Sequence, residues 1–173
     1  MVQVAQTDRL VLRHLTPDDA PFYRQQLNEP SWLAHIGDRQ VHTLADADAH
    51  LRANILPPYA ERGFGMYLVQ RRADAAPVGI CGLVQREALP APDLGFALLD
   101  AHAGLGYAQE AAQAVLRHAF ADLGLDRVLA ITAVTNQRSD RLLDKLGFAF
   151  QGMVPVGARS LRLYTRLPDA PGW

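Results

Sequence analysis

A glycine-rich stretch at residues 104–108 is the clearest candidate for ligand binding in this sequence. It reads Gly-Leu-Gly-Tyr-Ala, follows a short apolar run over residues 94–99, and precedes a long segment with helical apolar spacing. Glycines let a backbone approach a ligand closely, and the free N–H groups at a helix start suit a phosphate or pyrophosphate. A connection that simply turns a strand into a helix carries about equal weight. A Rossmann dinucleotide site fits less well, because Gln109 stands where its third glycine would fall.

Other chemistry-bearing residues do not form a recognisable site. His35, His42 and His50 lack the spacing of metal ligands, so surface or packing roles are favoured and no metal site is predicted. Cys81 lies in the apolar run 78–84 with no nearby histidine, which favours a small core residue over a nucleophile.

The first half of the chain must supply strands and helices to position the glycine stretch. A strand is predicted at 9–13, and two or three helices over 17–62, beginning at Thr16 and Thr43 and broken near Pro57-Pro58. Three antiparallel strands should follow, at 66–69, 78–84 and 94–99.

The second half starts with the most regular helix, whose apolar stripe runs from Ala108 to Leu123 and ends at Gly124. The spacing then predicts a buried strand at 128–131, a helix from Ser139 to Leu146 capped by Gly147, and closing strands at 148–154 and 161–167. The class is therefore α/β with a mixed sheet.

Composition limits the protein to a few classes. The 173 residues, 49% hydrophobic and 20% charged, fit one domain spanning 1–173, with a loose tail expected at 168–173. The 17 basic and 18 acidic residues leave a net charge of -1, which disfavours nucleic-acid binding through bulk charge. The single cysteine fits a reducing cytoplasm. No signal peptide or apolar run of about eighteen residues is present, so no membrane association is expected.

Several motifs, in order and spacing, resemble the GNAT superfamily of N-acetyltransferases, and within it the RimJ/RimL-like branch related to ribosomal-protein N-terminal acetyltransferases. The segments that resemble this branch cover nearly the whole chain: residues 7–13 with 17–20, the strand 94–98, the stretch 104–111, Asn136 to Ser139, and 144–148. The resemblance implies a single-domain GNAT-like fold, with a mostly antiparallel sheet of about six to seven strands flanked by helices.

The resemblance also implies acetyl-CoA as cosubstrate. In the family the pantetheine arm pairs like an extra strand with a splayed central strand, which assigns it to backbone groups near Ala97, Leu98 and Leu99. The pyrophosphate falls to the main-chain donors of the glycine stretch, with one aromatic ring packing alongside, so the full set is Gly104, Leu105, Gly106, Tyr107 and Ala108. The 3′-phosphate could meet Arg138, Arg141 or Lys145, which could equally be solvated charges.

Catalytic roles follow from the same comparison. Asn136 would bind the pantetheine arm or substrate, or only cap a helix, with binding favoured about two to one. Ser139 is the leading proton donor or water-orienting group for the departing thiolate. Asp93, where relatives often carry a carboxylate, is the candidate base, with Glu87 and His102 as rivals and a turn role after Pro92 equally weighted.

The sequence departs from the family at two places. Ala101, Ala103 and Leu105 replace the polar or basic side chains that many relatives place before or within the loop, so main-chain donors must carry the phosphates. Leu142 and Leu143 stand where several relatives have a tyrosine acid, which leaves a non-catalytic acetyl-CoA sensor as an alternative.

The acceptor amine is specified least. Trp32, His35 and Tyr67 are candidates to line an acceptor pocket, although aromatic residues there are more often core. An N-terminal α-amine of a peptide or protein is favoured, since a weak base suffices for an amine of low pKa. A polyamine, amino acid or aminoglycoside is the runner-up; a polyamine pocket would need acids such as Asp46, Asp48 and Glu61. A homodimer is compatible with the sequence, which does not fix the oligomeric state.

Overall fold

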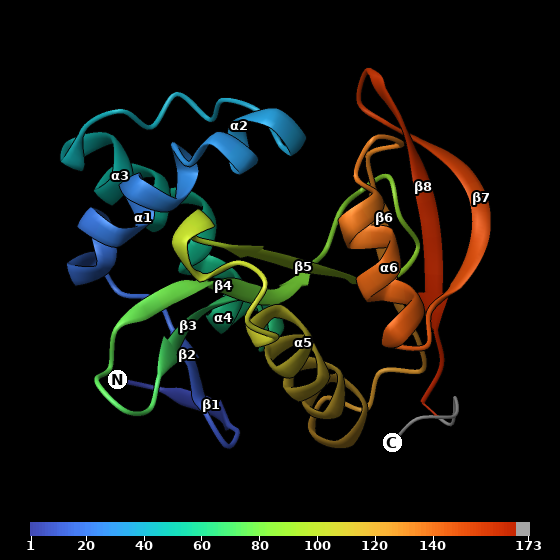
Figure 1. The fold of residues 1–173 in the computed structure, drawn as a ribbon, viewed down its shortest axis with the longest axis horizontal. Helices are drawn as coiled ribbons and strands as arrows, with labels where there is room; N and C mark the ends of the chain where they lie inside the picture. Colours follow the sequence, from blue (N-terminus) through green and yellow to red (C-terminus); the bar gives the residue numbers. More distant parts are fainter. Residues whose placement is uncertain (169–173) are drawn as a thin grey trace.

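One mixed sheet of eight strands forms the centre of the molecule, as a computed structural model describes it for residues 1–168 (Figure 1). The expected tail falls outside the described residues from position 169 onward. The strand order is β1-β2-β3-β4-β5-β6-β8-β7, and every neighbouring pair is antiparallel except β5 and β6. The strands are β1 (Gln3–Gln6), β2 (Leu10–His14), β3 (Met66–Arg71), β4 (Pro77–Val84), β5 (Asp93–Leu98), β6 (Val128–Thr132), β7 (Ala149–Val156) and β8 (Arg159–Arg166).

The predicted α/β class with a mixed sheet flanked by helices is confirmed, but the sheet has eight strands rather than six or seven. The additional strand is β1, which pairs with β2 at the edge of the sheet. Its four residues, Gln-Val-Ala-Gln, bury no side chain fully, so they carry little of the apolar alternation that identifies a strand in a sequence.

In the described part of the chain, six α-helices surround the sheet: α1 (Ala20–Leu27), α2 (Pro30–His35), α3 (Leu44–His50), α4 (Pro57–Arg62), α5 (Tyr107–Arg117) and α6 (Gln137–Lys145). Four of them lie before residue 63, more than the two or three predicted. Pro57 begins α4 instead of only breaking the preceding helix, because a proline in the first turn sacrifices no hydrogen bond. Pro30 begins α2 in the same way.

Helix ends follow the predicted signals closely. Thr43 caps α3 by accepting a hydrogen bond from the Asp46 amide at 3.1 Å. Beyond α5 the chain continues as a π-helical segment, His118–Asp122, and Gly124 follows with a left-handed φ of 66°. Gly147, with φ of 79°, follows α6. Both predicted glycine caps are therefore confirmed.

The sheet has a core on each face. Alternate residues of a strand point to opposite faces, so Tyr67 of β3 belongs to the cluster that includes α5 and α6, whereas Leu68 belongs to the cluster with α1 and α3. In Figure 1, α1, α2 and α3 gather on one side of β4 and β5, while α5 lies on the other.

Candidate functional site

The strands β5 and β6 separate after their first contact. They are parallel, and among the described residues one pair, Asp93 and Leu129, stands in register between them. Beside this pair, the Leu129 amide donates a hydrogen bond of 2.9 Å to the Pro92 carbonyl. Each strand pairs along its full length on its other side, β5 with β4 and β6 with β8. The result is a wedge between β5 and β6 that opens toward the carboxyl ends of both strands; we call it the wedge below. In Figure 1, β6, β7, β8 and α6 stand to one side of it.

Strand geometry decides which backbone groups of β5 face the wedge. The Leu99 amide donates to the Val78 carbonyl of the β4 segment at 2.9 Å, so Leu99 is turned toward β4. Because these groups alternate along a strand, Ala97 also faces β4, while Phe96 and Leu98 present their N–H and C=O groups to the wedge. Of the three predicted positions, the geometry therefore favours Leu98 and adds Phe96, and it turns Ala97 and Leu99 away.

The glycine stretch lies at the open end of the wedge, at the start of α5. Gly104 and Gly106 have left-handed φ values of 80° and 82°, which other residues adopt only with strain. A Cβ atom on Gly106 would lie 3.2 Å from Nη2 of Arg9, and one on Gly104 would lie 3.6 Å from Nη2 of Arg138. Gly104, Leu105 and Gly106 are exposed, so their backbone is accessible to a ligand.

Asn136 and Ser139 lie across the wedge, where β6 gives way to α6. Asn136 Oδ1 accepts a hydrogen bond from the Ser139 amide at 3.2 Å, so Asn136 is the N-cap of α6. The cap uses only the oxygen of the side-chain amide. Within residues 1–168, neither Asn136 Nδ2 nor the Ser139 hydroxyl makes a hydrogen bond, and both remain free to meet a ligand.

Asp93 lies at the closed end of the wedge and is almost completely buried. Its Oδ1 accepts a hydrogen bond from Arg86 Nε at 2.9 Å. Burial raises the pKa of the Asp93 carboxyl above its usual range, against the opposing pull of the Arg86 charge. Of its rivals, Glu87 is exposed in the turn after β4, and His102 lies beside the Tyr107 ring.

The three predicted acceptor-pocket residues do not come together. Trp32 and His35 lie on α2, and Trp32 packs against the core cluster of α1 and α3. Tyr67 is fully buried on the opposite face of the sheet, where its ring stacks with Tyr59 and His14. Tyr67 is thus part of a core, because its place in β3 points it toward α5.

The end of α2 reaches the hairpin between β7 and β8. Arg159, the first residue of β8, donates a hydrogen bond of 3.2 Å from Nη2 to the His35 carbonyl. Trp32 Nε1 and His35 Nδ1 are buried and have no hydrogen-bond partner in the described part of the chain. The helix α2 therefore meets the hairpin through its main chain, and it carries two buried ring nitrogens that are unpaired within the same described residues.

Two residues near the site have no clear signal in the sequence. Gln26 is fully buried in α1; its Nε2 donates to the Leu98 carbonyl at 3.4 Å, and its Oε1 has no partner among the residues described. A glutamine on an otherwise apolar helix face was the only available hint. Arg9 contacts the glycine stretch from the other end of the sequence, which no local pattern could predict.

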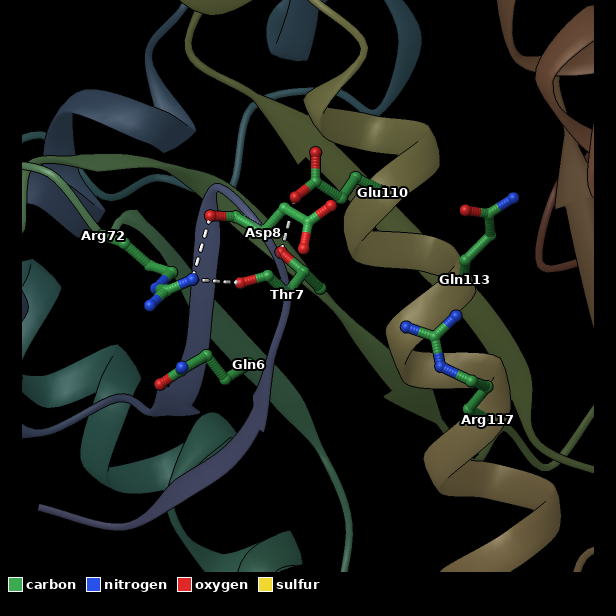
Figure 2. Close-up of a pocket in the computed structure, with 7 residues that line it drawn as sticks. All are labelled: Gln6, Thr7, Asp8, Arg72, Glu110, Gln113 and Arg117. Atoms are coloured by element: carbon green, nitrogen blue, oxygen red, sulfur yellow. Dashed lines mark hydrogen bonds between the residues drawn. The ribbon is translucent and has the colours of Figure 1, made fainter.

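A polar hollow of about 510 Å³ lies beside α5, away from the wedge (Figure 2). Gln113 and Arg117 line it from the helix, and Arg72 closes it by donating to the Thr7 and Asp8 carbonyls at 3.1 and 3.0 Å. Among the described residues, no group of three His, Cys, Asp or Glu side chains is placed to hold a metal ion. No helix in that part of the chain is both long and apolar enough to span a bilayer.

Comparison with known proteins agrees with this geometry. The family model of the acetyltransferase (GNAT) domain matches residues 9–149. The uncharacterised N-acetyltransferase YoaA of Bacillus subtilis is 26% identical over 157 residues, which cover 89% of this chain and 87% of YoaA. The chain belongs to the GNAT family, and it is an N-acetyltransferase enzyme.

Solved structures share the whole fold. A crystal structure of an acetyltransferase from Agrobacterium tumefaciens superposes with a TM-score of 0.81 at 23% identity, covering 96% of this chain and 94% of that one. RimL, the ribosomal L7/L12 α-N-protein acetyltransferase, in complex with coenzyme A, gives a TM-score of 0.82 at 22% identity, with coverage of 97% and 99%. The fold is thus that of the RimL proteins, in agreement with the resemblance to the RimJ/RimL-like branch.

Proposed function

We propose that this enzyme transfers an acetyl group from acetyl-CoA to the N-terminal α-amine of a peptide or protein, by direct attack within a ternary complex. The observation that carries this proposal is the wedge, with the start of α5 at its open end and the start of α6 across it. Coenzyme A in the RimL complex supports the choice of cosubstrate.

The residues present fit acetyl-CoA. Phe96 and Leu98 would pair with the amides of a pantetheine arm as a neighbouring strand does, and the exposed main chain of residues 104–106 would receive the diphosphate. Arg138, whose guanidinium lies beside Gly104, would add a charge that the loop itself lacks. When bound, acetyl-CoA supplies an activated acetyl thioester.

The chain's own groups would then orient the reactants and move protons. Asn136 Nδ2 would hold the pantetheine arm or the acceptor, and the Ser139 hydroxyl would donate a proton toward the leaving sulfur. Asp93 remains the proposed base at the closed end of the wedge, where burial has raised its pKa. Since CoA thiolate is a stable leaving group near neutral pH, the acid would help only modestly.

The acceptor would enter beside the end of α2, where the His35 carbonyl meets Arg159 of the β7–β8 hairpin. Trp32 and His35 of α2 remain the proposed lining residues. An α-amine is about one part in seven neutral at pH 7, so it needs little help from a base. Two of the three acids named for a polyamine are already engaged: Asp46 accepts hydrogen bonds from the His42 and Thr43 amides at the start of α3, and Asp48 pairs with Arg52 at 2.9 Å. The geometry thus favours a peptide over a polyamine.

Titration calorimetry and an acceptor panel test the proposal. We expect CoA and acetyl-CoA to bind at micromolar concentrations, and peptides beginning with Ala, Ser or Asp to be acetylated faster than spermidine, free amino acids or aminoglycosides. Rates on spermidine or an aminoglycoside far above every peptide would establish a small-amine enzyme instead. Binding of acetyl-CoA without transfer to any acceptor in the panel would instead favour the alternative role of a non-catalytic acetyl-CoA sensor.

A further inference from the structure

Arg9, in the turn near the amino terminus, contacts the glycine stretch at residues 104–108. Arg9 lies between β1 and β2, and its Nη1 donates to the Leu105 carbonyl at 2.9 Å. Its guanidinium also lies over the Tyr107 ring, 4.7 Å from the ring centre, and its Nη2 is the atom that a Cβ on Gly106 would meet at 3.2 Å. Arg9 therefore contacts Leu105 and Tyr107, and its guanidinium fills the space in which a side chain on Gly106 would begin.

The same arginine is paired with an acid in the first turn of α5. Glu110 Oε2 accepts from Arg9 Nε at 2.7 Å, and Oε1 accepts from the Arg9 amide at 3.0 Å. The Thr7 hydroxyl donates to Oε1 as well. Figure 2 shows Glu110 reaching from α5 toward this turn. The turn and the helix are thus joined by several hydrogen bonds across about a hundred residues of sequence.

The charge of Glu110 matters because of where it stands. A carboxylate in the first turn stabilises a helix through the dipole, but it opposes an anionic ligand at the same helix end. Partial burial raises the pKa of Glu110, but the hydrogen bonds from Thr7 and Arg9 outweigh it and lower that pKa overall. Glu110 is therefore ionised at neutral pH, and its charge must be cancelled for a diphosphate to bind well.

We propose that Arg9 is a positioning residue for the acetyl-CoA diphosphate: it fixes the shape of residues 104–107 and cancels the charge of Glu110 beside the ligand. This inference rests on the proposed function, since it assigns a role within the same cosubstrate site. The segment 7–13, which resembles the start of the RimJ/RimL-like branch, would thus contribute to cosubstrate binding through Arg9.

A set of charge-neutralising variants tests the proposal: Arg9→Gln, Glu110→Gln and the double variant, with Arg52→Gln as the control. Arg52 forms an exposed pair with Asp48 far from the loop, so its loss matches the chemical change without touching the site. We expect Arg9→Gln to weaken CoA binding about tenfold, because it removes the hydrogen bond to the Leu105 carbonyl and leaves the Glu110 carboxylate without its counter-charge. Glu110→Gln should weaken CoA binding much less, since weaker hydrogen bonds to Arg9 are offset by the loss of the negative charge beside the diphosphate.

The double variant should recover part of the loss seen in Arg9→Gln. The loss should also shrink between about 20 mM and 300 mM salt, which a purely structural role would not produce. With S-acetylpantetheine, which lacks the diphosphate, Arg9→Gln should match wild type in kcat/KM.

Three results would overturn the proposal: unchanged CoA affinity in a folded Arg9→Gln variant, a double variant no better than Arg9→Gln, or an equal loss with S-acetylpantetheine. Wild-type protein that fails to bind CoA at all would instead reject the proposed function from which this inference starts.

Discussion

At the scale of single residues, the side chain of Asn136 combines an observed capping role with a proposed binding role. Its Oδ1 completes the first turn of α6 by accepting the Ser139 amide, and its Nδ2 is left for a ligand. The two roles that the sequence left open are therefore compatible. They can be separated by a substitution that keeps the oxygen and removes the donor.

Asn136→Asp should leave the protein as stable as wild type, because aspartate caps helices as well as asparagine and suits the helix dipole. Turnover should fall at least about tenfold, since the amide donor is lost. Asn136→Ala is the comparison: it removes the cap too and should cost about 1 kcal/mol of stability. Thermal melts and steady-state rates measure both; a fully active Asp variant would leave Asn136 with capping alone.

Asp93 is a second residue at which stability and activity should separate. Because burial raises its pKa, the ionised form is disfavoured in the folded protein; its stability contribution is greatest at low pH and is lost as pH rises through the folded-state pKa. Asp93→Asn should therefore melt no lower than wild type at neutral pH. Turnover should drop by about a hundredfold, the usual loss for a general base.

The pH–rate profile supplies the check on Asp93. Wild-type activity should fall as acid protonates a group whose pKa lies above the ordinary carboxyl range, and Asp93→Asn should lose that limb. An Asn variant with wild-type turnover would restrict Asp93 to its ion pair with Arg86.

At the scale of elements, the loop before α5 depends on left-handed glycines, and the chain contains its own control. Gly106 and Gly124 have φ values of 82° and 66°, at the start and beyond the end of the same helical segment. A Cβ on Gly106 would crowd Arg9 at 3.2 Å, whereas one on Gly124 would meet nothing within 4 Å.

Gly106→Ala and Gly124→Ala should each cost about 1 kcal/mol of stability, because alanine in the left-handed region is strained. Only Gly106→Ala should weaken CoA binding, which calorimetry would show beside matched melting curves. Equal CoA affinity in the two variants would contradict the assignment of residues 104–108 to the diphosphate.

The elements also show how far sequence patterns reach. Long apolar periods and glycine caps located α6, and the helical segment made of α5 and the π-helical turn 118–122 after it, within a residue or two, because local spacing determines them. The same patterns missed which backbone groups of β5 face the wedge, since a strand with apolar residues on both faces shows no alternation. They also placed Tyr67 beside Trp32, although β3 turns Tyr67 to the other face of the sheet. Contacts such as Arg9 with Leu105 depend on tertiary pairing and have no local signature.

At the scale of the whole molecule, a half-buried histidine accompanies each of the two cores. His14 stacks on Tyr59 at 3.8 Å beside the α5 core, and His50 Nδ1 lies 3.1 Å from the Tyr23 hydroxyl beside the α1 core. Burial lowers the pKa of both imidazoles, with further lowering from His118 and Arg39 respectively.

These shifts predict that the protein loses stability in mild acid. Below a pH of about 6.5 the unfolded chain binds protons at these histidines that the folded chain refuses, so the unfolded state gains. Melting temperatures should fall between about pH 7.5 and pH 5.5, and a His14→Gln, His50→Gln variant should show a shallower fall. An equally steep fall in that variant would assign the acid sensitivity to other groups.

The wedge between β5 and β6 has a consequence for association as well as for catalysis. Beyond Asp93 and Leu129 the facing edges of the two strands do not pair with each other. The N–H and C=O groups along these edges could therefore pair with another extended chain, as those of an exposed edge strand can. A small molecule that lies along β5 would shield that edge as a neighbouring strand does. Bound coenzyme A would then protect the enzyme from association with other extended chains, because it would keep this unpaired edge covered between turnovers.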